Sequence, residues 1–200
     1  NMFYVTCIFG LIYLVLYPGL GSFKGLLGWT QHNQLEAEEQ AAKEKYGPIY
    51  AKYASQTVEA LGADEAALKI GERLYLTYCT ACHGSDAGGV KGFPNLRDND
   101  WQFGGTPDAI KTSIRDGRMG VMPAWEGPLG GEQGVNEVTQ YVLTLSKRAG
   151  VDEAAAEAGK PKYMAFCAGC HMPTGTGNQA LGAPNLTDNI WLYGGHEKDI

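Results

Sequence analysis

Four of the five cysteines of this 200-residue chain stand in two identical frames, and this repetition constrains the fold more than any other feature. The frames read C-T-A-C-H at 79–83 and C-A-G-C-H at 167–171. Both follow the pattern C-x-x-C-H, which is typical of c-type haem attachment. On a helical turn, cysteines three positions apart lie on one face, so both thiols reach the vinyl groups of one porphyrin. The histidine that follows then presents a ring nitrogen to the iron.

The two frames therefore predict two covalently bound haem c groups. The expected attachment residues are the four cysteines of the frames, Cys79, Cys82, Cys167 and Cys170. His83 and His171 are the expected axial ligands of the irons. The alternatives are a redox-active dithiol, a four-cysteine zinc site or disulfides. A zinc site does not require a histidine in the same place twice, so the repeated pattern favours haem.

A second motif repeats with the first. The segment P-N-L-R-D-N-D-W-Q-F-G-G at 94–105 returns as P-N-L-T-D-N-I-W-L-Y-G-G at 184–195. The chain thus contains one duplicated domain, expected at 64–150 and 151–200, and each copy holds one haem. Such small domains have thin cores, so the cofactor supplies part of the apolar centre.

The prolines that open these segments are expected to orient the haem ligands. The carbonyl of Pro94, eleven residues after His83, is placed to accept a hydrogen bond from the imidazole N–H, and Pro184 is the equivalent for His171. Such a bond fixes the ring and its basicity.

Apolar periodicity and capping residues predict the helices. Asp64 caps a helix running to about residue 78, and Gly71 leaves room for close crossing by a helix over 132–148. In the expected spacer, 24–63, residues 32–46 are helix formers, and Gly47-Pro48 is expected to end that helix. Pro161 is expected to be the first residue of a shortened helix before Cys167.

The sixth ligand of the first iron is expected to be a methionine. Met119 and Met122 lie in R-M-G-V-M-P-A-W, and Pro123 stiffens the loop directly after Met122. A thioether holds low-spin iron and raises its potential, so we favour Met122. The alternatives are Met119, or that both methionines only fill the core.

The second copy has no methionine at the equivalent distance after Trp191. We therefore expect the second distal ligand and the final helix to lie outside this sequence, and the sequence to be a piece of a longer protein at both ends. His196 is the weaker candidate for a ligand within it.

The amino-terminal segment has the character of a membrane anchor. Residues 1–23 carry no charged side chain, and 2–17 are almost continuously apolar. We predict a transmembrane helix over 1–23. A signal peptide is the alternative, but no basic residue opens the segment. Because haem c is attached outside the cytoplasm, the rest of the chain is expected to face the periplasm from the bacterial inner membrane.

Composition excludes several other classes. A hydrophobic fraction of 44% argues against a disordered chain. The net charge of −6 argues against nucleic-acid binding through phosphate contacts, so we expect no nucleic-acid partner. The predicted fold is mainly α.

Taken together, these features resemble the membrane-anchored dihaem cytochrome c subunits of cbb3-type cytochrome c oxidases, the CcoP family. The resemblance rests on the apolar segment N-M-F-Y-V-T-C-I-F-G-L-I-Y-L-V-L-Y-P-G-L-G, both C-x-x-C-H frames and both P-N-L-x-D-N-x-W-x-x-G-G segments. It implies a transmembrane helix followed by two class I cytochrome c domains, the second truncated. It also implies histidine and methionine at both irons, His83 with Met122 and His171 with a methionine outside the sequence. Exchange of distal ligands between the two domains stays open.

The resemblance further implies an electron-transfer role. Electrons are expected to come from a soluble periplasmic cytochrome c and to leave through a monohaem cytochrome c subunit for the catalytic haem–copper subunit, which reduces oxygen. The chain would contact membrane lipid and would not itself be the catalytic subunit. The alternatives are an anchored dihaem subunit of another respiratory complex, a dihaem peroxidase and a haem-based gas sensor.

Overall fold

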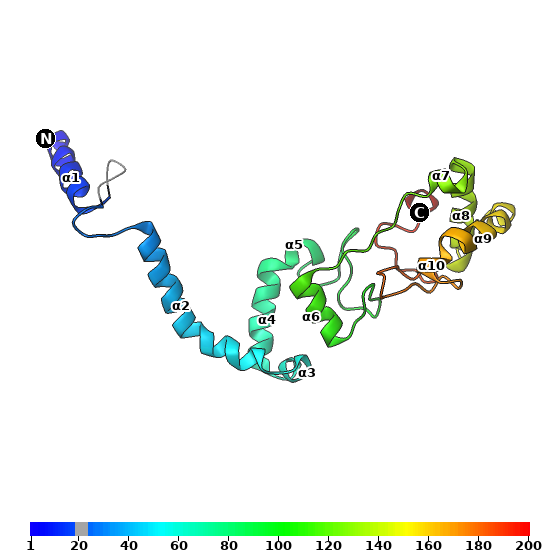
Figure 1. Cartoon of the computed structure of the whole chain (residues 1–200), viewed down its shortest axis with the longest axis horizontal. Helices are drawn as coiled ribbons and strands as arrows, with labels where there is room; N and C mark the ends of the chain where they lie inside the picture. Colours follow the sequence, from blue (N-terminus) through cyan, green and yellow to red (C-terminus); the bar gives the residue numbers. More distant parts are fainter. Residues whose placement is uncertain (19–23) are drawn as a thin grey trace. The chain divides into compact units, whose positions relative to one another are not determined.

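The described part of the computed structural model, residues 1–18 and 24–200, is mainly helical, as predicted (Figure 1). It divides into two compact units, Asn1–Ala67 and Leu68–Ile200. Both haem-attachment frames lie in the second unit. Among the described residues, β structure is limited to two isolated bridges, Val90 with Phe93 and Asn178 with Ala183.

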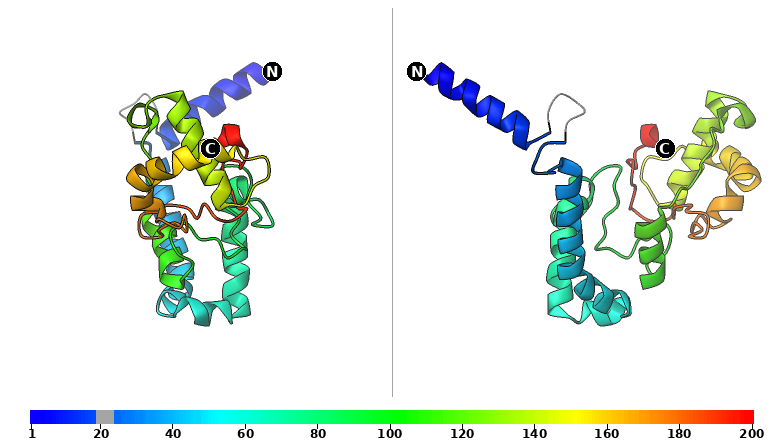
Figure 2. Two further views of the ribbon diagram at one scale, coloured as in Figure 1. Left: turned by 90° about the vertical axis from the view of Figure 1, so that its right-hand side faces the viewer. Right: turned by 60° about the vertical axis from the view of Figure 1, so that its left-hand side comes forward.

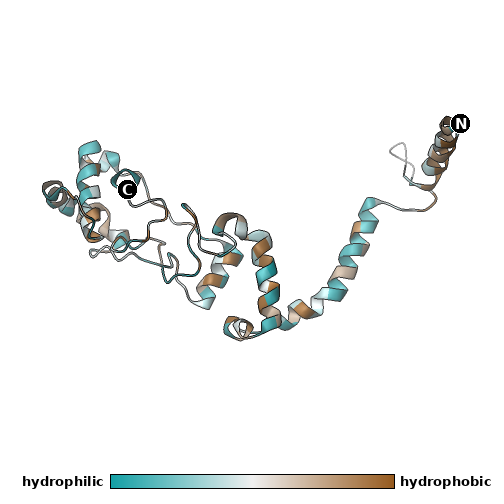
Figure 3. Cartoon of the chain, turned by 180° about the vertical axis from the view of Figure 1, so that it is seen from behind, coloured by the Kyte–Doolittle hydropathy of each residue, from teal (hydrophilic) through white to brown (hydrophobic). Residues whose placement is uncertain are grey.

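The first unit contains helices α1 (Met2–Leu16), α2 (Gln31–Ala54) and α3 (Val58–Gly62). Helix α1 is apolar along its length (Figure 3), and none of its residues is buried. The predicted transmembrane segment extends over residues 19–23, which lie outside the described residues. No helix in the described ranges combines the length and the apolar character needed to cross a membrane.

Helix α2 corrects one prediction. It continues through Gly47 and Pro48 instead of ending there. Pro48 has no N–H to donate to the carbonyl four residues earlier, so one helical hydrogen bond is lost. The residues on both sides are mostly good helix formers, and the helix resumes beyond the proline.

The second unit holds the duplicated motifs. Its helices are α4 (Glu65–Tyr78, which begins just before the unit), α5 (Thr80–His83), α6 (Pro107–Asp116), α7 (Glu126–Leu129), α8 (Glu132–Leu145), α9 (Glu153–Phe166), α10 (Ala168–His171) and the 3-10 helix η1 (Glu197–Asp199). The predicted cap is present, because Asp64 Oδ1 accepts hydrogen bonds from the N–H groups of Ala66 and Ala67. Asp152 caps α9 in the same way, through the N–H of Ala155.

The core of this unit lies between α8 and α9, which run side by side (Figure 2). The buried residues of the core cluster come from α7, α8, α9 and the start of α10: Leu129, Val138, Val142, Tyr163, Cys167 and Ala168. The prediction that 132–148 packs on 64–78 is therefore wrong. The carboxy-terminal helix of the first copy packs on the helix that leads into the second copy's haem-attachment frame.

Glycines explain this choice of partner. A Cβ at Gly159 would meet the backbone of Glu137, so α9 approaches α8 more closely there than any larger residue allows. The equivalent Gly71 of α4 has no described neighbour within 4 Å of a Cβ position. The close crossing predicted at Gly71 is thus found in the other repeat.

The prediction of a short helix starting at Pro161 is also wrong. Pro161 lies inside α9, which begins eight residues earlier. The side chain of Asp152 caps the helix, and the alanine-rich run over 154–158 favours it strongly. These contributions, together with packing on α8, outweigh the hydrogen bond that the proline removes.

Candidate functional site

The two C-x-x-C-H frames fold into the same helical turn. The N–H of His83 donates to the carbonyl of Cys79 over 3.0 Å, and the N–H of His171 donates to the carbonyl of Cys167 over 2.9 Å. This turn places the two cysteines of each frame on one side, three residues apart. Neither frame forms a disulfide, since all four thiols are free.

Each histidine is oriented by a proline carbonyl. Nδ1 of His83 lies 2.9 Å from the carbonyl oxygen of Pro94, and Nδ1 of His171 lies 3.0 Å from that of Pro184. A carbonyl oxygen only accepts, so Nδ1 carries the proton in both rings. Nε2 is left with its lone pair, which is the form of imidazole that binds a metal. The structure thus contains the contacts expected from the sequence.

A tyrosine supports each frame, which the sequence analysis missed. The hydroxyl of Tyr75 donates to the carbonyl of Gly84 over 2.7 Å, and that of Tyr163 donates to the carbonyl of Met172 over 2.9 Å. Both tyrosines stand four residues before the first cysteine of their frame. This shared position is the sequence signal that identifies them.

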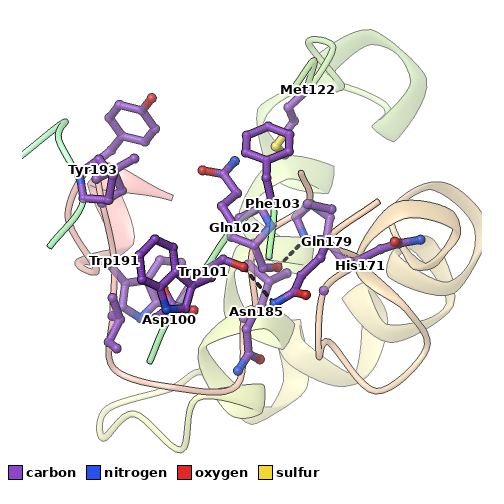
Figure 4. Close-up of a pocket in the computed structure, with 18 of the residues that line it drawn as sticks. Asp100, Trp101, Gln102, Phe103, Met122, His171, Gln179, Asn185, Trp191 and Tyr193 are labelled. Carbon is purple, nitrogen blue, oxygen red and sulfur yellow. Dashed lines mark hydrogen bonds between the residues drawn. The ribbon is translucent and has the colours of Figure 1, made fainter. Parts of the chain in front are cut away.

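One large cavity contacts both repeats. Its volume is about 2140 Å³, and Figure 4 shows part of its lining. Equivalent residues of the two copies line it: Tyr75, Cys79, His83, Pro94 and Trp101 from the first, and Tyr163, Cys167, His171, Pro184 and Trp191 from the second. Small-molecule pockets commonly measure about 300–1,000 Å³, so this cavity has room for more than one large cofactor.

The second frame is the more deeply buried. His171 is 7% exposed and Tyr163 is 0% exposed, whereas His83 and Tyr75 are half-buried. Burial raises the pKa of the Cys167 thiol above its usual value. Burial, with the nearby Cys167 thiol, raises the pKa of Tyr163 to about 12, so its hydroxyl remains a donor across the neutral range. Cys170 is exposed and Cys82 half-buried.

Of the two candidate methionines, Met122 lines the cavity. The chain beyond it approaches the second frame. The ring of Trp125 lies 5.7 Å from that of Phe166, the residue before Cys167, and Leu129 packs in the same core cluster as Cys167. The third candidate, His196, points its Nδ1 at Asp199, 3.1 Å away, and its side chain is exposed.

The residues present fit covalent haem. Each repeat supplies two free thiols on one turn, an imidazole whose Nε2 carries the lone pair, and part of a shared cavity wall. Met122 adds a soft thioether to that wall. A chain with this arrangement is a c-type cytochrome.

Comparisons with known proteins show which family of c-type cytochromes the chain resembles. The chain matches the family described as "Cytochrome C oxidase, cbb3-type, subunit III" over residues 66–142, and the "N-terminal domain of cytochrome oxidase-cbb3, FixP" over residues 1–24. It is 52% identical to the cbb3-type cytochrome c oxidase subunit CcoP of Rubrivivax gelatinosus, over 100% of this chain and 66% of that protein. The chain therefore spans about two thirds of that relative's length.

Two further relatives agree. The subunit CcoP of Cereibacter sphaeroides is 35% identical over 99% of this chain and 74% of its own length. The subunit FixP of Azorhizobium caulinodans is 35% identical over 99% of this chain and 73% of its own length. The chain belongs to the CcoP/FixP family of cytochrome c subunits of cbb3-type oxidases, which confirms the resemblance read from the sequence.

Proposed function

We propose that the chain carries two covalently bound haem c groups and conducts electrons through them within a cbb3-type oxidase. The observation that carries the proposal is the repeated geometry: two thiol pairs on matching turns and two imidazoles held by proline carbonyls, lining one cavity. When bound, haem iron supplies a one-electron redox couple. The proposed domains are 64–150 and 151–200, with one haem in each.

The protein's residues attach, orient and shield the cofactor. Cys79 and Cys82 would form the thioethers in the first repeat, and Cys167 and Cys170 would form them in the second. The proline carbonyls hold each proximal imidazole in one tautomer and increase its basicity. A covalently held haem would serve here as a one-electron carrier, so the proposed role is electron transfer and the oxygen chemistry belongs to another subunit.

We propose that Met122 and His171, which line the same cavity, would together hold the iron of the haem attached to the second repeat. The sequence left open whether distal ligands are exchanged between repeats, and the helix packing supports exchange. Helix α8 follows the Met122 loop and packs on α9, which leads into Cys167. Contact between Trp125 and Phe166 holds the loop on the same side.

Single-haem variants test this assignment. Cys79→Ala/Cys82→Ala retains only the second haem, and Cys167→Ala/Cys170→Ala retains only the first. We expect Met122→Ala to lower the midpoint potential by on the order of 0.1 V and to allow carbon monoxide binding only in the variant with the second haem. Met119→Ala is the matched control and leaves both readouts unchanged. If Met122→Ala changes only the variant that keeps the first haem, Met122 is instead a ligand of the same iron as His83.

We also propose how the subunit is placed. Helix α1 exposes an apolar surface all round, and the segment 1–23 is proposed to anchor the chain in the inner membrane among lipid or apolar helices. The haem domains then face the periplasm. The proposed donor is a soluble periplasmic cytochrome c, and the proposed acceptors are the monohaem cytochrome c subunit and the catalytic haem–copper subunit.

The route is tested in the assembled oxidase. Reduced soluble cytochrome c is mixed with the complex, and haem absorption is followed after oxygen is added. We expect the loss of both cysteine pairs, at 79/82 and at 167/170, to abolish rapid electron entry while the catalytic subunit still reacts with oxygen when reduced artificially. An unchanged rate of electron entry from the soluble cytochrome c would contradict the proposed route.

A further inference from the structure

Besides the packing of α8 on α9, the two repeats also touch through a small set of residues beside the cavity, here termed the inter-repeat contact. Its members are Gly92, Trp101, Gln102 and Phe103 of the first repeat, and Gln179, Gly182 and Leu192 of the second. The side-chain amide of Gln102 donates to the carbonyl of Gly182 over 2.6 Å. The side-chain amide of Gln179 donates to the carbonyl of Trp101 over 2.9 Å (Figure 4).

The contact is reciprocal in terms of the sequence repeat. Gly92 and Gly182 occupy equivalent positions, as do Gln102 and Leu192. The N–H of Gly92 donates to the carbonyl of Leu192 over 2.7 Å, and the side-chain amide of Gln102 donates to the carbonyl of Gly182, so the first repeat is the donor in both hydrogen bonds. The same two positions therefore meet twice, with the repeats exchanged.

Both glycines of the contact have backbone conformations that favour glycine. Gly92 and Gly182 both have positive φ, at 90° and 67°. A Cβ at Gly182 would overlap the ring of Phe103. Glycine at position 182 therefore leaves the space that the Phe103 ring occupies, whereas Gly92 is favoured by its φ alone.

The contact is directly connected to the haem ligands. Gly92 stands two residues before Pro94, whose carbonyl holds His83, and Gly182 stands two residues before Pro184, whose carbonyl holds His171. A shift of either loop at the contact moves the carbonyl that orients an imidazole. The contact therefore links the positions of the two proximal ligands.

We infer that Gln102 and Gln179 are positioning residues for electron exchange between the two haems. Their amides join the two proline loops beside the cavity, in addition to the packing of α8 on α9, and so help to set the separation and orientation of the two cofactor sites. The rate of electron transfer between bound groups falls steeply as they move apart, so a loosened contact slows exchange. The inference rests on the proposed two-haem function.

The test uses the full subunit in the assembled oxidase. The variants are Gln102→Ala, Gln179→Ala and their double; Gln40→Ala is the matched control, because its amide donates to Glu44 on the surface of α2. Gln102→Glu keeps the size of the side chain but loses the donating amide. Haem content is measured first in an alkaline pyridine spectrum, so a failure of the two-haem proposal is seen separately.

The first readout is hydrogen exchange at the N–H of Gly92, which none of the substitutions removes. We expect exchange to be about fivefold faster in each single variant and about 25-fold faster in the double variant. The second readout is the rate at which an injected electron equilibrates between the haems. We expect it to fall in the same order, with two haems per chain retained in every variant.

Gln102→Glu is expected to behave like Gln102→Ala, and Gln40→Ala like the unmodified subunit. Unchanged Gly92 exchange in the double variant would show that the glutamines do not hold the contact. Faster Gly92 exchange with unchanged electron equilibration would show a contact without influence on the haems. Either result overturns the inference.

Discussion

The two repeats form the same haem-attachment turn but differ in what covers it. In the second repeat, α9 buries Ala156, Gly159 and Tyr163 against α8. In the first repeat, no residue of the described helix α4 is buried. The turn, the proline contact and the tyrosine hydroxyl are nevertheless present in both. Local sequence is therefore sufficient for the attachment geometry, and the partner helix decides how well the site is shielded.

Two positions explain the difference. Gly159 allows the backbone of α8 to approach, and Lys162 pairs with Glu137 over 2.7 Å while donating to the carbonyl of Leu129. The equivalent of Lys162 in α4 is Leu74, which is exposed. The second repeat thus has the residues that pack against and pair with α8, and the first repeat lacks them.

The largest expected effect is at the tyrosines. Tyr163→Ala removes a fully buried ring and should lower the free energy of unfolding by about 3–5 kcal/mol. Tyr75→Ala, at the equivalent half-buried position, should cost markedly less. Chemical denaturation of the haem-loaded chain measures both. Equal losses would contradict the difference in burial between the repeats.

The paired glycines give a smaller and more specific effect. Gly159→Ala forces α9 away from the backbone of Glu137 and should cost about 1–3 kcal/mol. Gly71→Ala meets open space inside a helix and should stabilise by up to about 1 kcal/mol. The two thermal midpoints should move in opposite directions. A loss at Gly71 as large as that at Gly159 would mean that α4 also has a close helical partner.

Sequence patterns predicted what is local and missed what depends on tertiary contacts. The capping by Asp64, the helical turns of both frames and the contact of His83 with Pro94 all follow from neighbouring residues. The pairing of helices does not follow from neighbouring residues, because a helix of either repeat could cover the apolar stripe of α8. Both proline predictions failed for a related reason, since good helix formers and caps outweigh one lost hydrogen bond.

The smallest expected effect is electrostatic. Hydrogen bonds from Lys162 and, with a smaller effect, from Gln133 lower the pKa of the Glu137 carboxyl group. A carboxylate whose pKa is lowered by folding stabilises the native state. The stabilisation is fully present when the pH is above the ordinary pKa of about 4.3, and it is lost as the pH falls through the lowered pKa. We therefore expect stability to fall below about pH 4 in the unmodified chain.

Glu137→Gln should flatten that acid dependence, measured as the denaturation midpoint against pH. Glu157→Gln, an exposed substitution on the same pair of helices, is the control and should leave the dependence unchanged. If the denaturation midpoint of Glu137→Gln depends on acid pH as strongly as that of the unmodified chain, the ion pair does not stabilise the packing of α8 on α9.

The site was more predictable than the packing around it. The cysteines and histidines were identified from spacing alone, because covalent attachment demands fixed intervals, and the prolines were identified from the repeated segment that they open. The two supporting tyrosines lie outside the C-x-x-C-H pattern and are identified by their repeated position, four residues before the first cysteine. The glutamines of the inter-repeat contact are identified only by their contacts in space. The geometry around Met122 could not be predicted, since it depends on which repeat receives α8.

The most direct test of the account is the haem content of the matured chain. The alkaline pyridine spectrum and the intact mass should show two covalent haems per chain, and each paired cysteine-to-alanine variant, at 79/82 or at 167/170, should lose one. A matured chain that carries no covalent haem, or that keeps two after either pair is removed, would contradict the account.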